Sequence, residues 1–483
     1  MKTNVIFSSA LLFAVSLSYA QAPRALSRDE KTVLSGIENQ RETYSRIALE
    51  IWNLAELGYQ EYKSSALLQS ELKSAGFEVE AGVAGMPTAF VASYGKGKPV
   101  IGILAEFDAL PGISQQALPV RMEREDLRSG HACGHHLFGT GSSAGAIAIK
   151  DWLEKSGVSG TIRLYGTPAE EGGSAKVYMV RAGLFEDTDV VLSWHAGNVN
   201  SAGAGSCLAI KSAKFRFYGN ASHAAGAPER GRSALDGVEA MNDMVNMLRE
   251  HVPQETRIHY VITRGGEAPN VVPGFAEVYY YVRHPQMNRV KAIFERVVLA
   301  ARGAAMGTGT RVEYEVIGGS YNLLPNESLA RMMHASLEKV GGITYTEEER
   351  EFITKIMETY PSEDLSPDDA SKIIPFVVKK QAGAFSTDTG DVSWVVPATG
   401  LRIATWAPGT SSHSWQAVAA GGTTIGIKGM MVAAKTIALT AIEIYKNPDI
   451  AVKAREEMIR RRGPDFKYEA LLGDREVPLD YRK

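Results

Sequence analysis

The chain has few cysteines and almost no excess charge. Its 483 residues include only two cysteines, and the formal net charge is −3, from 52 basic and 55 acidic side chains. Because there is no basic stripe to hold a phosphate backbone, a nucleic acid is not the expected partner. We also find no internal repeat and no low-complexity tract. The composition, 45% hydrophobic and 22% charged, is that of a globular protein, and we expect its ligand to be small.

Long apolar runs are rare as well. The first twenty residues, MKTNVIFSSALLFAVSLSYA, combine an early lysine, an apolar run and a Ser-Tyr-Ala end. This layout predicts a secretory signal cleaved after Ala20 and a mature protein that is periplasmic or secreted, and the alternative is a buried hydrophobic helix. No later segment is expected to be long and apolar enough to cross a bilayer.

The chain length and the apolar periodicity predict an α/β protein with more than one domain. The run VIGILAEF at 100–107 is almost continuously apolar, which is typical of a parallel strand covered on both faces. The alternation of strands and helices predicts a parallel or mixed sheet with helices on both faces. Helices are expected over 28–57, 137–153, 173–182 and 425–445, strands over 89–93, 100–107, 160–165 and 190–194, and helical surface elaboration over 347–375.

A second unit interrupts this pattern. From about Lys211 the expected order is strand, helix, strand, strand, helix, strand, which is the ferredoxin-like β-α-β-β-α-β arrangement. Turn-rich segments at its edges, SAGAGS and GGSYNLLPN, mark it as an inserted domain. We therefore predict a signal at 1–20, an inserted domain at 210–322, and a main domain in two parts at 21–209 and 323–483.

The stretch HACGHH at 131–136 places three histidines and one of the two cysteines within six residues. A cysteine with imidazoles two positions before and two after has the spacing of metal ligands, and zinc prefers Cys, His and carboxylate ligands. The alternative, in an oxidising compartment, is a disulfide between Cys133 and Cys207. We favour the metal site, with Cys207 as a small buried hydrophobic residue.

Other candidate ligands follow predicted strands, where sites form in open α/β sheets. Asp108 follows the strand at 100–107, Glu170 and Glu171 follow the next, and His195 follows the strand at 190–194, while His413 lies in a later Gly/Ser-rich loop. Each has an ordinary alternative, namely a turn cap, a solvated pair or a hydrogen-bonded turn histidine. Together they favour a site for two zinc ions, in which one of the paired glutamates binds metal and the other accepts a proton from water.

Six ordered motifs support a family resemblance: HACGH, TPAEEGG, WHAG, ASHAA, PERGRSAL and PNVVPGFAEVYYYVR. Together they resemble the metal-dependent aminoacylase and carboxypeptidase family, and within it the branch of indole-acetyl-amino-acid hydrolases and p-aminobenzoyl-glutamate hydrolase. The run STDTGDVSW looks most like the latter group. The resemblance implies a catalytic domain with two divalent metal ions, zinc or alternatively manganese. It also implies a lid domain through which such proteins form homodimers or larger homo-oligomers.

The resemblance also implies roles for individual residues. Glu170 would be the general base, and Asp108 would orient the site. In the lid, His223 would stabilise the oxyanion across the dimer, and Asn270 and Arg283 would hold a substrate carboxylate. The implied metal ligands are Cys133, His135, Glu171, His195 and His413.

In one respect the chain departs from the family pattern. Many relatives carry Asp after Cys-Gly-His, whereas this chain has His136, which is either an extra ligand or a neighbour that tunes the site. Glu106 has no assigned role. The implied activity is hydrolysis of the amide of N-acyl, including aroyl, amino acids. The rivals are a dipeptidase or aminopeptidase on the same scaffold and a non-catalytic, metal-dependent binding protein.

Overall fold

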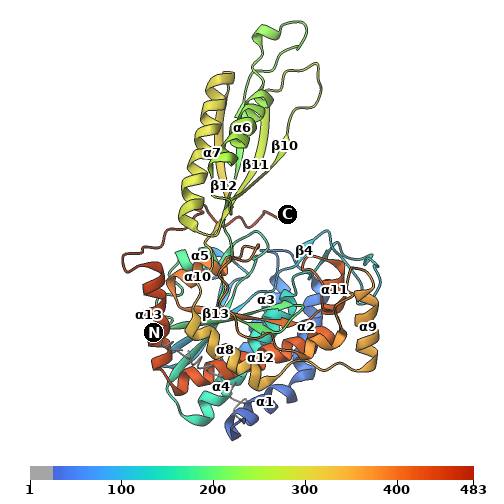
Figure 1. Ribbon diagram of the computed structural model, residues 1–483, viewed down its shortest axis with the longest axis vertical. Helices are drawn as coiled ribbons and strands as arrows, with labels where there is room; N and C mark the ends of the chain where they lie inside the picture. The colour runs from blue at the N-terminus through green and yellow to red at the C-terminus, as the bar shows by residue number, and fades with distance from the viewer. Residues whose placement is uncertain (1–24, 483) are drawn as a thin grey trace, which may run out of the picture.

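The computed structural model describes residues 25–482, so the predicted signal at 1–20 lies outside the described residues. The described chain forms two units, each with its own sheet and its own hydrophobic core. The small unit, residues 209–320, stands on the large unit as an elongated projection (Figure 1). The predicted fold class, a mixed α/β sheet interrupted by a ferredoxin-like unit, is confirmed.

The large unit is built on a seven-stranded mixed sheet in the order β1-β2-β6-β3-β7-β13-β8. Strand β3 pairs in parallel with β6 and β7, and β13 pairs in parallel with β7. All six residues of β3 are buried, because helices and loops cover this central strand on both faces. The strands are β1 (Glu78–Ala81), β2 (Phe90–Lys96), β3 (Val100–Ala105), β6 (Gly160–Gly166), β7 (Val190–Gly197), β8 (Ser201–Ala202) and β13 (Ala398–Ala404), with a separate pair β4 (Leu110–Pro111) and β5 (Ser129–Gly130).

The helices of the large unit pack in layers on this sheet. Helices α4, α8 and α12 contact the strands, and α1 and α2 cover α4. The approach of α4 to α12 depends on small residues, since a Cβ atom on Gly141 would lie 3.0 Å from Met430 Cγ. The helices are α1 (Arg28–Asn39), α2 (Arg41–Leu54), α3 (Tyr62–Ser74), α4 (His135–Ser156), α5 (Ala175–Arg181), α8 (Glu327–Val340), α9 (Glu347–Met357), α10 (Thr389–Val395), α11 (Trp415–Gly421), α12 (Thr424–Lys446) and α13 (Asp449–Arg462).

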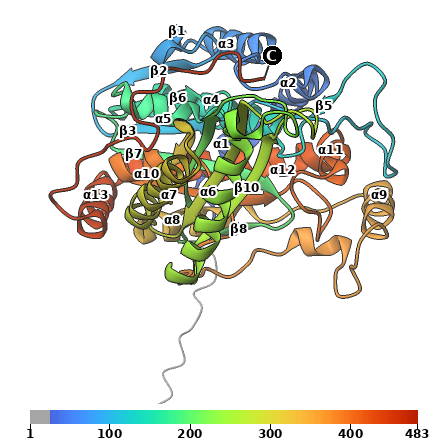
Figure 2. The same ribbon diagram turned by 90° about the horizontal axis from the view of Figure 1, so that it is seen from above.

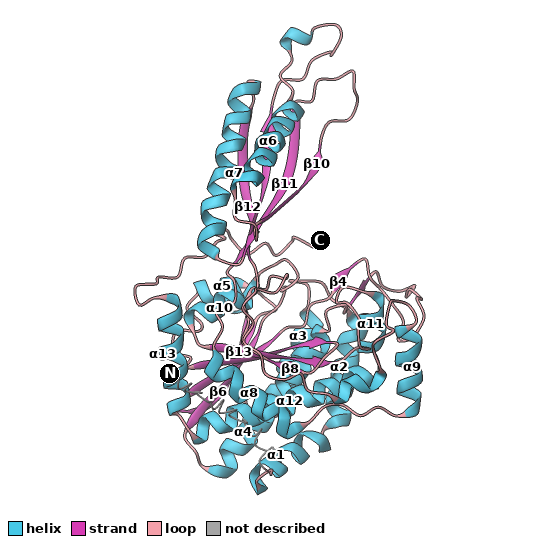
Figure 3. Cartoon of the chain, viewed as in Figure 1, coloured by secondary structure: helices cyan, strands magenta, loops and turns pink. Residues whose placement is uncertain are grey.

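The small unit is a four-stranded antiparallel sheet in the order β10-β11-β9-β12, with two helices packed on it (Figure 3). Viewed from above, it projects over the large sheet (Figure 2). Strand β10 is an edge strand, and it exposes the side chains of Tyr260, Val261 and Ile262. The elements are β9 (Ala209–Tyr218), α6 (Ala234–Leu248), β10 (Arg257–Arg264), β11 (Phe275–His284), α7 (Met287–Thr308) and β12 (Arg311–Ser320).

The structure corrects several expectations about helices. The predicted helix over 28–57 is wrong, because the chain turns at Gln40, after the weak helix former Asn39, and forms α1 and α2. The helix expected over 137–153 begins two residues earlier, so HACGHH does not lie wholly before it, and His135 and His136 belong to the first turn of α4. The segment 347–375 is only partly helical, in α9 and a short 3₁₀ helix at Pro367–Ser371.

One helix also overturns the expectation that no later segment could span a membrane. Among the described residues, α12 is long and apolar enough to do so, with a mean hydropathy of 1.5. Its apolar window is 89% buried inside the protein. The helix is therefore the core helix that its apolar face predicts.

Candidate metal centre

Polar side chains from separate segments of the chain meet where the parallel strands of the large sheet end. Glu106 and Asp108 follow β3, Glu170 and Glu171 follow β6, and His195 lies near the end of β7. Because β3, β6 and β7 are parallel, these carboxyl ends share one edge of the sheet. The start of α4 and the loop after β13 add the remaining candidates at the same edge.

The side chains form three overlapping groups whose ligand atoms lie within 4.8 Å of one another. All five ligands predicted from the family resemblance occur in these groups, as does the predicted base, Glu170. Glu106, which had no assigned role, joins them. The groups are Cys133, His135 and His195; Cys133, Glu171 and His413; and Glu106, His135 and Glu170.

Hydrogen bonds orient the histidines so that one ring nitrogen faces the cluster. His195 donates from Nδ1 to its neighbour's carbonyl, Ala196 O, at 2.7 Å, which leaves Nε2 at 3.4 Å from Cys133 Sγ. Burial and the nearby Arg402 lower the pKa of His195 to about 3, so its ring is neutral and can bind a cation. His135 likewise donates from Nδ1 to Asp108 Oδ1 at 2.9 Å and turns Nε2 to the cluster.

Asp108 joins two of the candidate ligands. While Oδ1 accepts from His135, Oδ2 accepts the backbone N–H of Glu171 at 2.9 Å. Burial by itself would raise the pKa of Asp108, but the imidazole of His135 outweighs it and the pKa is lowered. The side chain is thus held as a carboxylate between a helix start and a strand-end loop, in the position expected of an orienting residue.

Glu170 and Glu171 lie in a loop with an unusual backbone. Ala169 and Ser174 have positive φ angles of 52° and 59°, which non-glycine residues rarely adopt. Glu171 Oε1 lies 3.1 Å from His413 Nε2, so the loop places this carboxylate against a predicted ligand from the other end of the chain. Burial, together with the neighbouring carboxylates of Glu106 and Glu171, raises the pKa of Glu170 well above the ordinary value.

A buried lysine was not found by sequence reasoning. Lys176, on α5, is fully buried and donates from Nζ to Glu106 Oε1 and to Asp388 Oδ1, both at 2.7 Å. The other oxygen of Glu106 lies 3.1 Å from His135 Nε2. Asp388 does lie within the run STDTGDVSW, but nothing in the sequence distinguishes Lys176 from a surface lysine. The pair of carboxylates and the lysine form an ionic cluster beside the candidate ligands.

The structure shows the surroundings of two residues, His136 and Cys207, whose roles the sequence did not decide. His136 points away from the cluster, because its Nε2 bonds with the carbonyl of Gly421 at 2.9 Å and none of the ligand groups includes it. It is therefore a packing neighbour and not an extra ligand. Cys207 is buried and unpaired, as is Cys133, so the structure contains no disulfide between them.

The cluster has the donor set and the unsatisfied atoms that fit metal ions. Among the described residues, Glu106 Oε2, His135 Nε2 and Glu171 Oε1 are buried and form no hydrogen bond of good geometry, although Glu106 Oε2 lies 3.1 Å from His135 Nε2 and Glu171 Oε1 lies 3.1 Å from His413 Nε2. Burial, and then the carboxylate of Glu171, raises the pKa of the Cys133 thiol, so a thiolate here requires a positive neighbour. Buried polar atoms are normally paired, and a cation would satisfy this set at once.

Comparisons with known proteins identify the family. Residues 209–306 match the family described as Peptidase dimerisation domain. One of the subunits of the p-aminobenzoyl-glutamate hydrolase of Escherichia coli (strain K12) is 40% identical, over 87% of this chain and 93% of that protein. The Xaa-Arg dipeptidase of Mus musculus is 30% identical, over 87% of this chain and 90% of that protein. The chain belongs to the M20 family of metal-dependent hydrolases.

A solved structure agrees with this assignment at the level of the fold. A dinuclear metal binding peptidase of the M20 family from Bacillus subtilis has a TM-score of 0.57 at 17% identity, covering 86% of this chain and 99% of that one. The resemblance drawn from the six sequence motifs is thereby confirmed. As an M20 protein the chain is a metal-dependent amidohydrolase, so the interpretation as a binding protein without catalysis is set aside.

Two of the three small-unit residues with predicted roles lie at the end of that unit remote from the candidate metal centre of the same chain. The segments 219–233 and 265–274, which contain His223 and Asn270, form the tip of the small unit (Figure 1). They are joined there by a hydrogen bond from Ala224 N–H to Asn270 O at 3.0 Å. Arg283 lies at the opposite end of β11, next to the large unit, because its strand partner is Ile210 at the start of β9. The length of β11 separates the two ends by roughly 25–30 Å. Their predicted roles stay predictions.

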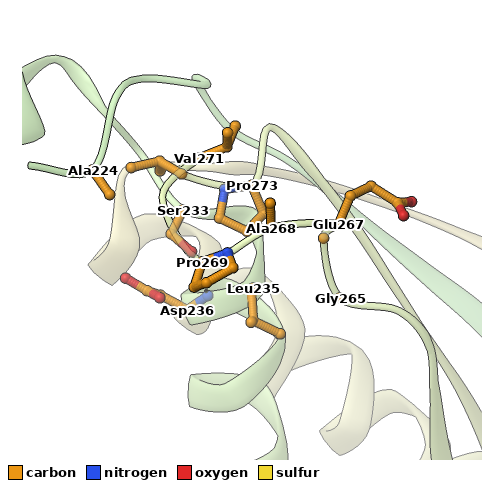
Figure 4. Close-up of a pocket in the computed structure, with 12 residues that line it drawn as sticks. Ala224, Ser233, Leu235, Asp236, Gly265, Glu267, Ala268, Pro269, Val271 and Pro273 are labelled. Carbon is orange, nitrogen blue, oxygen red and sulfur yellow. Dashed lines mark hydrogen bonds between the residues drawn. The ribbon is translucent and has the colours of Figure 1, made fainter.

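A cavity of about 510 Å³ lies beside these tip loops (Figure 4). Its lining includes Ala224 and Val271, which adjoin His223 and Asn270 in the sequence, together with Ser233, Leu235, Asp236 and residues 265–269, 272 and 273. None of the candidate metal ligands borders it. It is therefore distinct from the metal centre of this chain.

Proposed function

We propose that the protein hydrolyses the amide bond of N-acyl amino acids, including aroyl-glutamates, at a centre of two divalent metal ions, most simply zinc. The observation that supports this best is the cluster itself, in which one cysteine, three histidines and one glutamate meet with Glu170 beside them. The E. coli relative supports the substrate class, since it is part of a p-aminobenzoyl-glutamate hydrolase.

The five residues that would hold the ions are Cys133, His135, Glu171, His195 and His413. Ions bound there would polarise the substrate carbonyl, make water more acidic and lower the pKa of Glu170 towards neutrality. Glu170 takes a proton from water at its carboxylate and delivers it to the nitrogen of the leaving amine. Asp108 keeps His135 and the Glu171 loop in place, and the Lys176 ammonium balances the charge of Glu106 and Asp388.

The small unit supplies the remaining groups. Arg283 has its Nε without a hydrogen-bond partner among the described residues, and it lies at the end of the small unit nearest the large one. Its planar fork suits the carboxylate of an acyl amino acid. Asn270 lies at the tip, at the other end of β11, so it would act as a second donor at the centre of the other protomer. His223 stabilises the oxyanion of the other protomer, since its own tip position is far from the metal centre of its chain.

This arrangement requires a dimer, which we propose forms through the small unit. Strand β10 presents an unpaired edge with exposed Tyr260, Val261 and Ile262, and an apolar edge of this kind is a natural pairing surface. The match of residues 209–306 to a peptidase dimerisation domain supports the same conclusion. A homodimer is the simplest assembly. The alternative is a complex with a different chain, because the E. coli enzyme has two kinds of subunit and both resemble this chain.

The location of the protein is part of the same proposal. The N-terminal pattern of an early lysine, an apolar run and a Ser-Tyr-Ala end is that of a secretory signal. On this basis we place the mature protein in the periplasm.

The test is to incubate the purified protein with a panel of N-acyl and aroyl amino acids, with and without a chelator, and to follow products by mass spectrometry. We expect release of the free amino acid that stops when the chelator is added. Absence of release from every blocked substrate would reject the proposal.

A second candidate is a dipeptidase, favoured by the 30% identity to the mouse Xaa-Arg dipeptidase. The same panel distinguishes the two when dipeptides with a free α-amine are included. Preference for these over their N-acylated counterparts would establish the dipeptidase.

A further inference from the structure

The last part of the described chain contacts both units. Residues 463–482, here called the C-terminal strap, leave α13 and run first along the small unit, where Leu471 is buried in that unit's core. The strap then crosses to α5, where Arg181 Nη1 donates to the carbonyls of Gly473 and Arg475 at 2.9 and 2.8 Å. Its end lies between the two units (Figure 1). The strap thus connects the small unit with the upper edge of the large one.

The strap ends on the loop that carries the paired glutamates. Arg482 Nη2 donates to the backbone carbonyl of Glu171 at 2.7 Å, and Tyr481 Oη donates to the same carbonyl at 3.3 Å. The Tyr481 ring packs edge-on against Tyr59, with centroids 5.7 Å apart. Gly58 lies directly beneath it, where a Cβ atom would lie 2.1 Å from Tyr481 Oη and 3.0 Å from Ala169 Cα. The docking of the strap end is therefore shaped by residues on both sides.

The loop needs such support because its backbone is strained. Ala169, Gly172 and Ser174 all have positive φ angles, and two of the three are not glycine. Conformations of this kind persist only where the surroundings over-determine them. Gly172, which follows Glu171, is also exposed to solvent.

The other hydrogen bonds that hold the loop do not involve the carbonyl of Glu171. Ala169 N–H donates to the buried Glu61 carboxylate at 2.8 Å, Tyr59 Oη donates to Gly173 O at 2.8 Å, and Asp108 accepts the N–H of Glu171. None of these reaches the carbonyl of Glu171. Within residues 25–482, only Tyr481 and Arg482 donate to it.

We propose that Tyr481 and Arg482 are positioning residues for the metal centre, which hold the peptide of Glu171 so that its carboxylate faces Cys133 and His413. The inference rests on the proposed role of Glu171 as a metal ligand. The N–H of Glu171, in the peptide that precedes its Cα, is fixed by Asp108, and its carbonyl, in the peptide that follows, is fixed by the strap, so the backbone is held on both sides of this Cα. Residues that orient a ligand in this way typically contribute ten- to hundredfold to metal affinity.

The experiment compares Arg482→Ala, Arg482→Lys and Tyr481→Phe with the parent in the full-length protein. The matched control is Lys467→Ala, which removes a positive charge from an exposed position earlier on the strap. Two quantities are measured: hydrogen exchange of peptides covering 169–174 in metal-free protein, and zinc affinity by competition with a chromophoric chelator. For Arg482→Ala we expect faster exchange in this loop and about ten- to hundredfold weaker zinc binding.

Arg482→Lys should recover part of the affinity, because an ammonium can also donate to a carbonyl. The thermal midpoint of Arg482→Ala should stay close to that of the control, which separates positioning from general destabilisation. Parent-like exchange and parent-like zinc affinity in both Arg482→Ala and Tyr481→Phe would overturn the proposal. Both readouts are independent of turnover, so a parent that hydrolyses no substrate refutes the proposed function while leaving the inference about the strap to be decided by its own data.

Discussion

The edge of the large sheet and the tip of the small unit both carry residues with predicted roles, but they differ in how those residues are held. At the sheet edge, His135 is fully buried and its ring lies between two carboxylates. At the tip, His223 is exposed, and its Nδ1 accepts only N–H groups of its own loop, from Ala225 and Gly226. The candidate metal ligands thus come together within one chain, whereas the tip residues would take their proposed roles only at another chain's centre or after a movement of the small unit.

This difference matches how accurately each set of side chains must be positioned for its proposed role. Buried ligands are fixed by hydrogen bonds on rigid strand and helix ends, which suits groups that must meet within tenths of an ångström. Groups that grip the substrate can be brought in later by closure or by a second protomer. Four substitutions test this difference between the sheet edge and the small unit.

Changing Glu170 to Gln should have the largest effect on turnover. The amide keeps the shape of the side chain but cannot accept a proton from water, so we expect kcat to fall by about 10² to 10⁴. Metal content, measured by elemental analysis, should be unchanged because Glu170 is not among the proposed ligands. Glu267→Gln, an exposed change near the tip, is the matched control. A near-normal rate would remove Glu170 from the role of base.

Changing Lys176 to Met should destabilise the large unit. The change leaves the carboxylates of Glu106 and Asp388 buried without their cation, and breaking a buried pair in this way costs about 3–5 kcal/mol. Chemical unfolding of Lys176→Met beside the exposed control Lys467→Met measures the cost. Adding Asp388→Asn should restore part of the loss, because one of the unpaired charges is then removed. Equal stability of Lys176→Met and its control would show that the ionic cluster does not contribute to the free energy of unfolding.

The fold could be predicted from the sequence where periodicity reflects burial directly. The continuous apolar run of β3 and the alternating strands of the small unit are examples, because each pattern follows from which faces are covered. The break at Gln40 could not be predicted, since neither Pro nor Gly marks it and Asn39 is a single weak helix former among the strong formers Glu38, Gln40 and Arg41. The bounds of α12 were predicted within one residue at each end, but its apolar character was underestimated, because scattered Gly, Lys and Thr interrupt its apolar residues.

The candidate site was predictable only in part, for a related reason. Ligands such as Cys133 and His195 follow strands or precede a helix, so their type and position are informative together. Lys176 carries no such signal, because a lysine becomes a buried ion only through Glu106 and Asp388, which lie far from it in the sequence. The strap contacts of Arg482 are likewise set by tertiary packing.

Changing His223 to Ala tests whether the tip serves a second protomer. Loss of one oxyanion donor should lower kcat by about 10² to 10³. Mixing His223→Ala with Glu170→Gln, each inactive alone, should then restore activity, because one site in each mixed dimer has both groups. Random exchange of protomers would give about one intact site in four. Activity that stays at the sum of the two variants would show that each chain uses its own His223.

The junction between the two units contains a buried carboxyl group whose protonation should make the stability of the protein depend on pH. Asp391 is fully buried on α10, where Oδ2 accepts the backbone N–H of Tyr321 at the exit from the small unit and Oδ1 accepts from Tyr468 of the strap at 2.7 Å. Burial outweighs these two hydrogen bonds and raises the pKa of Asp391 to about 7, from an ordinary value of 3.8. The folded protein therefore binds this proton more tightly than the unfolded chain does.

Changing Asp391 to Asn should remove this pH dependence, with the smallest effect of the four. Because the folded pKa is raised, the stabilisation is complete below about pH 4 and is lost as the pH rises through about 7. Asparagine resembles the protonated acid, since its oxygen can accept from Tyr321 and its amide can donate to the Tyr468 hydroxyl. Parent and variant should therefore have similar thermal midpoints at pH 5, and the parent should be less stable at pH 8 by an amount on the order of 1–2 kcal/mol. Asp474→Asn, exposed on the strap, should follow the parent at both pH values. If the difference in stability between the parent and Asp391→Asn is the same at pH 5 and pH 8, protonation of Asp391 does not stabilise the junction between the large and the small unit.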